Sequence, residues 1–148
     1  MRGVGTLDPG WGITPVRIAM GLILFLAGWG KLTGEGGIAA VAAEFGEMGI
    51  PLPGMAALFV VILEVVGGLL LLAGLAARWV GLLVALQFAY ITAALKLPAD
   101  GWDGARLDVL LLAAGLLLFL AGAGRLSIDE AWLARERRPG PGGSRRAV

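Results

Sequence analysis

Four long runs of apolar residues, separated by short polar or glycine- and proline-rich segments, dominate the chain. Each has about the 20 residues that a helix needs to cross a hydrocarbon core of roughly 30 Å. The runs cover residues 13–32, 53–75, 78–97 and 105–124. The pattern therefore predicts an all-α, polytopic membrane protein built as a four-helix bundle. A soluble helical bundle is disfavoured because only 16% of the residues are charged, too few to coat its surface.

The segment between the first two runs, residues 34–54, has a different pattern. Its apolar residues from Ile38 to Met48 recur every three or four positions, with acidic residues on the opposite side. This spacing predicts a short amphipathic helix lying in the membrane interface. Pro51 and Pro53 then end the helix and turn the chain into the second run.

Basic residues are distributed unevenly between the two predicted membrane faces. An even number of crossings places the N-terminus, the turn at residues 75–78 and the C-terminus on one face, and that face carries nine of the twelve Lys and Arg residues. These are Arg2, Arg17, Arg78, Arg125, Arg135, Arg137, Arg138, Arg145 and Arg146. The other face carries Lys31, Lys96 and Arg106. Because positive loops stay in the cytoplasm, we expect both termini to be cytoplasmic.

The chain divides into a membrane domain, residues 1–134, and a basic tail, residues 135–148. The tail is rich in Pro and Gly, and we expect a disordered arm near anionic lipid rather than a nucleic-acid-binding segment. The first run contains Arg17 and lacks a small-x-small cleavage site, so we expect a retained helix rather than a cleaved signal peptide.

Composition removes several classes of chemistry. The chain has no Cys and no His, which excludes a disulfide, a thiolate nucleophile and a Ser-His triad formed by this chain. We expect no haem, iron–sulfur or zinc site, because carboxylates alone are a poor ligand set for these groups. Any redox role would then depend on a bound organic molecule or on a partner protein.

Glu64 is the most informative polar residue. It lies at the centre of the second run, eleven residues from either end, where it is about 16 Å from each membrane surface. A carboxylate at this depth is costly, so Glu64 either has a partner or carries a proton. Gln87 of the third run lies at a similar depth, and Tyr90 shares its helix face.

Each run carries one stripe that mixes polar and small residues at helical spacing. The stripes are Arg17, Gly21, Gly28 and Lys31; Glu64, Gly67 and Gly74; Gln87, Tyr90 and Ala94; and Asp108, Gly115 and Gly122. Small residues permit close helix packing in membranes, so we expect the stripes to face inward. Lys31, Lys96 and Asp108 would form a second polar cluster near the outer edge.

Three interpretations of these polar residues stay open. They are a hydrogen-bonded network that fixes helix register, a site for a small lipophilic or redox molecule, and a proton or ion pathway. The candidate residues for the site or network are Glu64, Gln87, Tyr90, Arg17, Lys31 and Asp108.

Several motifs resemble the DoxX family of bacterial four-helix membrane proteins. They are VRIAMGLILFLAGWGKL from Val16, FGEMGIPLPGMAALFVVILEVVGGLLLLAGLAAR from Phe45, and GAGRLSIDEAWL from Gly122. Their order and spacing carry the resemblance, which covers residues 14–133. It implies a multi-pass protein of the bacterial inner membrane.

The resemblance also implies a function, although it transfers no catalytic residues. It suggests a membrane subunit or accessory of an oxidoreductase or oxidant-defence system, with a quinone-like ligand among the helices and a soluble or membrane redox partner. A non-enzymatic scaffold is the alternative, with the capped segment 127–138 docking soluble proteins, and a small transporter is a third. Glycine-rich faces also permit a homo-oligomer.

Overall fold

The computed structural model describes residues 8–129, and those residues form helices joined by short turns, without a strand. The elements in chain order are α1 (Pro9–Thr33), α2 (Gly37–Glu47), α3 (Pro53–Ile62), η1 (Leu63–Gly67), α4 (Gly68–Ala73), α5 (Ala77–Tyr90), η2 (Ile91–Lys96) and α6 (Leu97–Ala121). The segments η1 and η2 are π-helical turns. The basic tail and most of the proposed docking segment lie outside the described residues.

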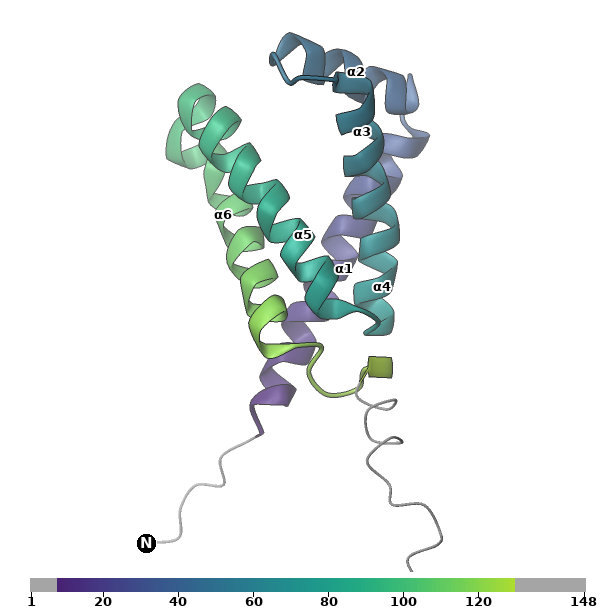
Figure 1. The fold of residues 1–148 in the computed structure, drawn as a ribbon, viewed down its shortest axis with the longest axis vertical. Helices are drawn as coiled ribbons and strands as arrows, with labels where there is room; N and C mark the ends of the chain where they lie inside the picture. Colours follow the sequence, from purple (N-terminus) through teal and green to yellow (C-terminus); the bar gives the residue numbers. More distant parts are fainter. Residues whose placement is uncertain (1–7, 130–148) are drawn as a thin grey trace, which may run out of the picture.

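Three helical stretches are long and apolar enough to cross a membrane: Pro9–Thr33, Pro53–Ala73 and Ala77–Ala121. The third stretch is 45 residues long and contains a kink at Gly101, whose φ of 63° is a conformation that favours glycine. The chain reverses there, so α5 and α6 lie side by side (Figure 1). The expected all-α, multi-pass membrane fold is confirmed, while the limits of the four individual crossings stay a prediction.

The two ends of the described chain lie at the same end of the molecule, here called the terminal end (Figure 1). The opposite end carries α2 and is called the α2 end. Toward it, the α5–α6 pair diverges from α3. The expected amphipathic helix is α2, which buries Val41 against the rest of the protein.

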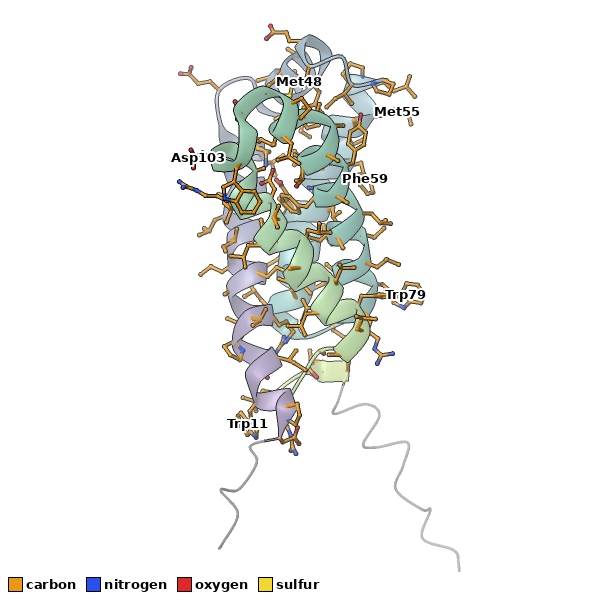
Figure 2. The ribbon with its side chains drawn as sticks, turned by 90° about the vertical axis from the view of Figure 1, so that its left-hand side faces the viewer. Trp11, Met48, Met55, Phe59, Trp79 and Asp103 are labelled. Atoms are coloured by element: carbon orange, nitrogen blue, oxygen red, sulfur yellow. The ribbon has the colours of Figure 1, made fainter. Side chains whose placement is uncertain are left out.

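Large apolar side chains cover the outside of the helices, as lipid contact requires. Leu26, Leu110 and Leu120 are 58%, 64% and 72% exposed. Trp79 is 69% exposed and points away from the helices (Figure 2). Such a surface would drive association in water, but in a bilayer it faces hydrocarbon.

Small residues bring the helix backbones together inside. A Cβ at Gly28 of α1 would lie 2.7 Å from the Cβ of Glu64, so only glycine permits this approach between α1 and η1. Between α5 and α6, Gly81 and Gly115 each face the other's carbonyl oxygen, at 2.8 and 2.7 Å from an added Cβ. The predicted stripes therefore include two of these closely packed glycines, Gly28 of α1 and Gly115 of α6. They do not include Gly81 of α5.

The terminal end is held by polar contacts around Arg17, which is 1% exposed. Its guanidinium donates to the carbonyl oxygens of Leu71 and Leu72 at the end of α4, and to that of Leu126 at 3.0 Å. Asp129 accepts hydrogen bonds from the amides of Ala76 and Ala77, at 3.1 and 3.3 Å. It thereby caps the N-terminus of α5 from a distant part of the chain.

Candidate functional site

A cavity of about 640 Å³ lies at the α2 end, between η1 on one side and α5, η2 and α6 on the other. It is called the charged cavity here. Its ionisable lining residues are Lys31, Glu44, Glu64, Lys96, Asp100 and Asp108. Its larger apolar lining residues are Phe45, Met48, Val60, Phe88, Ile91 and Leu95. Apolar walls with a few charged groups are typical of sites for small organic molecules.

An ion pair between Lys31 and Glu64 forms the polar wall of the cavity. The Lys31 ammonium donates to both carboxylate oxygens of Glu64, at 2.7 Å to Oε1 and 2.6 Å to Oε2. The Glu64 side chain is 5% exposed and that of Lys31 is 34% exposed. The carboxylate is therefore buried, whereas the ammonium lies at the edge of the cavity.

Local backbone geometry places Glu64 at this position. Pro53 starts α3 at its first turn, and the helix widens into the π-turn η1 at Leu63, one residue before Glu64. Such π-turns are rare and are found frequently at functional sites. Gly28 faces the turn from α1, and the absence of a side chain there leaves space for the stem of Glu64.

Asp108 of α6 lines the same cavity from the opposite side. Its residue exposure is 9%, and its Oδ2 atom is buried without a hydrogen-bond partner. A buried acceptor without a partner is costly, and in native proteins it calls for an explanation such as a missing ligand or water. Asp108 thus lines the cavity with one carboxylate oxygen that has no hydrogen-bond partner.

Gln87 and Tyr90 do not line the charged cavity. Gln87 is buried, and neither atom of its amide has a hydrogen-bond partner. Tyr90 is 50% exposed on the outside of α5, which corrects the expectation that it faces inward with Gln87. Residues three apart on a helix differ by about 60° in direction, which is enough to turn Tyr90 out of the interior.

Two further expectations also change. Arg17 lies at the terminal end and binds backbone carbonyls, so it is not part of the charged cavity. Lys31 was expected in an outer-edge cluster with Lys96 and Asp108, separate from Glu64. Its flexible four-carbon stem instead carries the ammonium to Glu64, which joins the two groups in one site.

The sequence patterns predicted only part of the walls that α2 and η2 supply. Ala94 and Lys96 of η2 were expected to face inward and do line the cavity, whereas Phe45 of α2, Met48 just after it, and Ile91 and Leu95 of η2 were not assigned to a site. Ile91, Ala94 and Leu95 have the spacing of one helix face, and this signal was present in the sequence. Nothing in the sequence distinguished that face from the ordinary packing of an apolar helix.

A second cavity, of about 820 Å³, lies at the terminal end. Its acidic residues are engaged in structural contacts: Asp8 pairs with Arg125, and Asp129 caps α5. The Arg125 hydrogen bond lowers the pKa of Asp8 below its ordinary value, and the Gly10 amide adds to this effect. These contacts hold the two ends of the described chain in place, which is a structural role. We therefore assign the candidate site to the charged cavity.

Residues 8–129 contain no group of three or more His, Cys, Asp or Glu side chains that could hold a metal ion. The chemical groups that the cavity offers are two ammoniums, four carboxylates and two aromatic rings. These groups can bind and orient a polar ring and exchange protons with it.

A family model described as DoxX matches residues 12–97. The "Putative oxidoreductase CatD" of Bacillus subtilis (strain 168) is 38% identical over 116 residues, which cover 77% of this chain and 81% of that protein. The "Inner membrane protein YqjF" of Escherichia coli (strain K12) is 35% identical over 123 residues, covering 80% and 90% of the two chains. No solved structure matches.

Proposed function

Because the chain belongs to the DoxX family, we propose that it is a membrane subunit or accessory of an oxidoreductase or oxidant-defence system that binds a small quinone-like molecule in the charged cavity. One relative carries the name of an oxidoreductase and another that of an inner membrane protein, which supports this role and an inner-membrane location. The proposal includes cytoplasmic termini, supported by the uneven distribution of Lys and Arg.

The observation that carries the proposal is a buried ion pair on the wall of an otherwise apolar cavity. A pair that served only to fix helix register would be enclosed by protein. The Lys31–Glu64 pair instead borders about 640 Å³ of space, which falls within the usual range for small-molecule sites.

The lining residues have separate tasks in this proposal. Lys31 donates a hydrogen bond to a ring oxygen and stabilises negative charge on it. Glu64 holds the Lys31 ammonium in place and can exchange a proton with the bound ring. Phe88 and Ile91 supply apolar walls that exclude water. A quinone-like ring, when bound, supplies the redox chemistry that these side chains lack.

Electron transfer then requires a partner protein. The chain has no Cys with which to handle a thiol or persulfide, so a soluble or membrane partner would supply that group. The exposed, apolar faces of the helices leave room for a membrane partner or a second copy of the chain.

Apolar packing in the interior of the protein favours a ligand site over a continuous proton or ion pathway. Leu24, Leu71, Val84 and Leu118 are each 0% or 1% exposed. They fill the interior of the protein with large apolar side chains. A polar path from the charged cavity to the terminal end would have to pass this layer.

Ligand affinity tests the proposal. Purified protein is titrated with a short-chain quinone analogue, and the Kd is compared with those of Lys31→Met and of the double variant Lys31→Met/Glu64→Gln. We expect at least a roughly 10-fold weaker Kd in both, because each loses a charge-assisted hydrogen bond. Asp103→Asn, at a side chain that is 89% exposed, is the matched control and should bind as wild type.

The double variant guards against loss of folding, since it removes the buried carboxylate together with its partner. An analogue that fails to bind the wild-type protein contradicts the proposal. So does a folded double variant that binds the analogue as tightly as wild type.

A further inference from the structure

The second cavity, at the terminal end, is called the terminal cavity here. It is lined by the start of α1, the start of α5 and the segment that follows α6. Its ionisable lining residues are Asp8, Arg78, Arg125 and Asp129. Its volume of about 820 Å³ falls within the usual range for small-molecule sites. The two arginines make it the more basic of the two cavities by residue type, and their partners decide what it can bind.

Both carboxylates of the terminal cavity are compensated by the protein itself. Asp8 accepts hydrogen bonds from Arg125, at 3.1 Å from Nε and 2.5 Å from Nη2. Asp129 accepts from two backbone amides at the N-terminus of α5, where the helix dipole favours an anion. It also interacts electrostatically with the buried Arg17. Neither carboxylate is therefore placed to balance a further cation.

Arg78 is that further cation. Within the part of the chain that the structure describes, it forms no ion pair with a carboxylate. Its Nη2 lies 3.5 Å from the carbonyl oxygen of Leu120, at the limit of a hydrogen bond, and its Nε faces Gly122. These contacts place the guanidinium beside the C-terminal end of α6. A guanidinium has five N–H donors in one plane, so most of them remain for a bound anion.

Trp79 connects the terminal cavity with the surface that contacts lipid. It lines the cavity next to Arg78, and it is also 69% exposed on the outside of the helices (Figure 2). Tryptophan side chains in membrane proteins typically lie at the level of the lipid headgroups. Ile13 and Ala121 add apolar lining. Arg78 is thus expected at the depth of the lipid phosphates, with apolar surface beside it.

We propose that the terminal cavity binds the headgroup of one anionic phospholipid, with Arg78 contacting its phosphate. The chemistry recognised is a phosphate ester, because its oxygens match the planar guanidinium in a bidentate pair. The acyl chains extend past Trp79 into the hydrocarbon. Basic pockets between helices on the cytoplasmic side bind anionic headgroups in other membrane proteins, and the terminal end is the one expected to face the cytoplasm. This inference is independent of the ligand in the charged cavity.

The net charge of the headgroup provides the selectivity. A zwitterionic lipid such as phosphatidylcholine carries the same phosphate together with an attached cation, which the positive charge of Arg78 repels. Phosphatidylglycerol carries the phosphate without that cation. We expect wild type to bind phosphatidylglycerol at least about 5-fold more tightly than phosphatidylcholine.

The experiment measures the Kd values of these two lipids, with identical acyl chains, from the thermal stabilisation of the purified full chain in a neutral detergent. The preference for phosphatidylglycerol should fall about 5- to 10-fold in Arg78→Gln and in Arg78→Met. The basic tail is the same in all variants, so its attraction for anionic lipid cancels in the comparison. Arg106→Gln removes an arginine at the α2 end whose side chain is 69% exposed, and it should keep the wild-type ratio.

Glycerol phosphate, which has the phosphate without acyl chains, separates a lipid from a soluble ligand. If it binds wild type as tightly as phosphatidylglycerol does, a soluble phosphate compound is the ligand and the lipid assignment is wrong. Equal Kd values of the two lipids in wild type overturn the proposal, and so does an unchanged ratio in the Arg78 variants. An equal loss in Arg106→Gln would show general charge attraction in place of a site.

Discussion

Glu64 lies in a membrane-spanning stretch with its side chain almost fully buried, and Lys31 reaches it with two short hydrogen bonds. The position of the lysine matters, because a carboxylate in a low-dielectric interior is stabilised mainly by a close cation. Sequence position alone placed the two residues in different clusters. The length and flexibility of a lysine side chain are properties that helix spacing does not represent.

Removing one partner of this pair should cost more stability than removing both. Lys31→Met leaves a buried carboxylate without a cation, whereas Lys31→Met/Glu64→Leu leaves two apolar side chains. Because Lys31 is one-third exposed, we expect the single variant to lose less than the ~3–5 kcal/mol typical of fully buried pairs. Unfolding free energies of both variants in mixed micelles check this. A double variant less stable than the single one contradicts it.

Asp8 predicts a pH dependence at the terminal end. Its pKa is lowered in the folded protein, chiefly by the hydrogen bond from Arg125. A lowered folded-state pKa stabilises the protein fully above the unfolded value of 3.8, and this stabilisation is lost as the pH falls through the folded value. Wild type should therefore be more stable than Asp8→Asn at neutral pH, and the difference should vanish in strong acid.

Thermal unfolding of the two proteins across this pH range is the measurement. Because the pair is exposed, the difference should also shrink at high salt. A difference between wild type and Asp8→Asn that persists unchanged well below pH 3.8 would show that the ion pair is not its cause.

At the scale of the elements, α1 and η1 fit together through Gly28. A methyl group there would meet the Cβ of Glu64 at 2.7 Å and Val65 at 2.8 Å, so the helices must separate. We expect Gly28→Ala to destabilise the protein by about 1–3 kcal/mol and to weaken ligand binding through displacement of Glu64.

Gly30 provides the matched control on the same helix. Nothing lies within 4 Å of a Cβ added at Gly30, so Gly30→Ala should leave stability unchanged or slightly raised. Unfolding and ligand titration of both variants are compared. Equal effects of the two substitutions would contradict the close-packing role of Gly28.

The sequence predicted which segments form helices, but it did not predict the irregular turns within them. Apolar runs predicted the long helices, and the spacing from Ile38 to Met48 predicted α2. The π-turns at Leu63 and Ile91 were not predicted, because they change the helical register by one residue without a residue-type signal. The outward position of Tyr90 was missed for a related reason, since a predicted stripe is wider than a real buried face.

For the whole molecule, the closed terminal end and the divergent α2 end could not be deduced from one-dimensional patterns. Long-range contacts such as those of Arg17 with Leu71 and Leu126 depend on how the helices meet. The resemblance to a family predicted which residues form motifs. It did not show that the motif from Gly122 to Asp129 closes the terminal end by capping α5.

Orientation in the membrane is testable because the chain has no native cysteine. Asp103→Cys, near the kink at the α2 end, should react with an impermeant maleimide from outside intact cytoplasmic membranes. Gly12→Cys, near the start of α1, should react only after permeabilisation, since the basic face is expected to be cytoplasmic. Both positions are exposed. The opposite labelling pattern would show an inverted topology.

The most direct measurement of the central claim is photoaffinity labelling with a photoreactive, short-chain quinone analogue, followed by peptide mapping. We expect labels on the cavity walls, at Phe45 of α2, at Met48 directly after it and at Leu95 of η2. These labels should be lost with excess unlabelled ligand and in Lys31→Met. Labels confined to lipid-facing residues such as Leu26 and Leu120, and insensitive to competitor, would contradict a ligand site in the charged cavity.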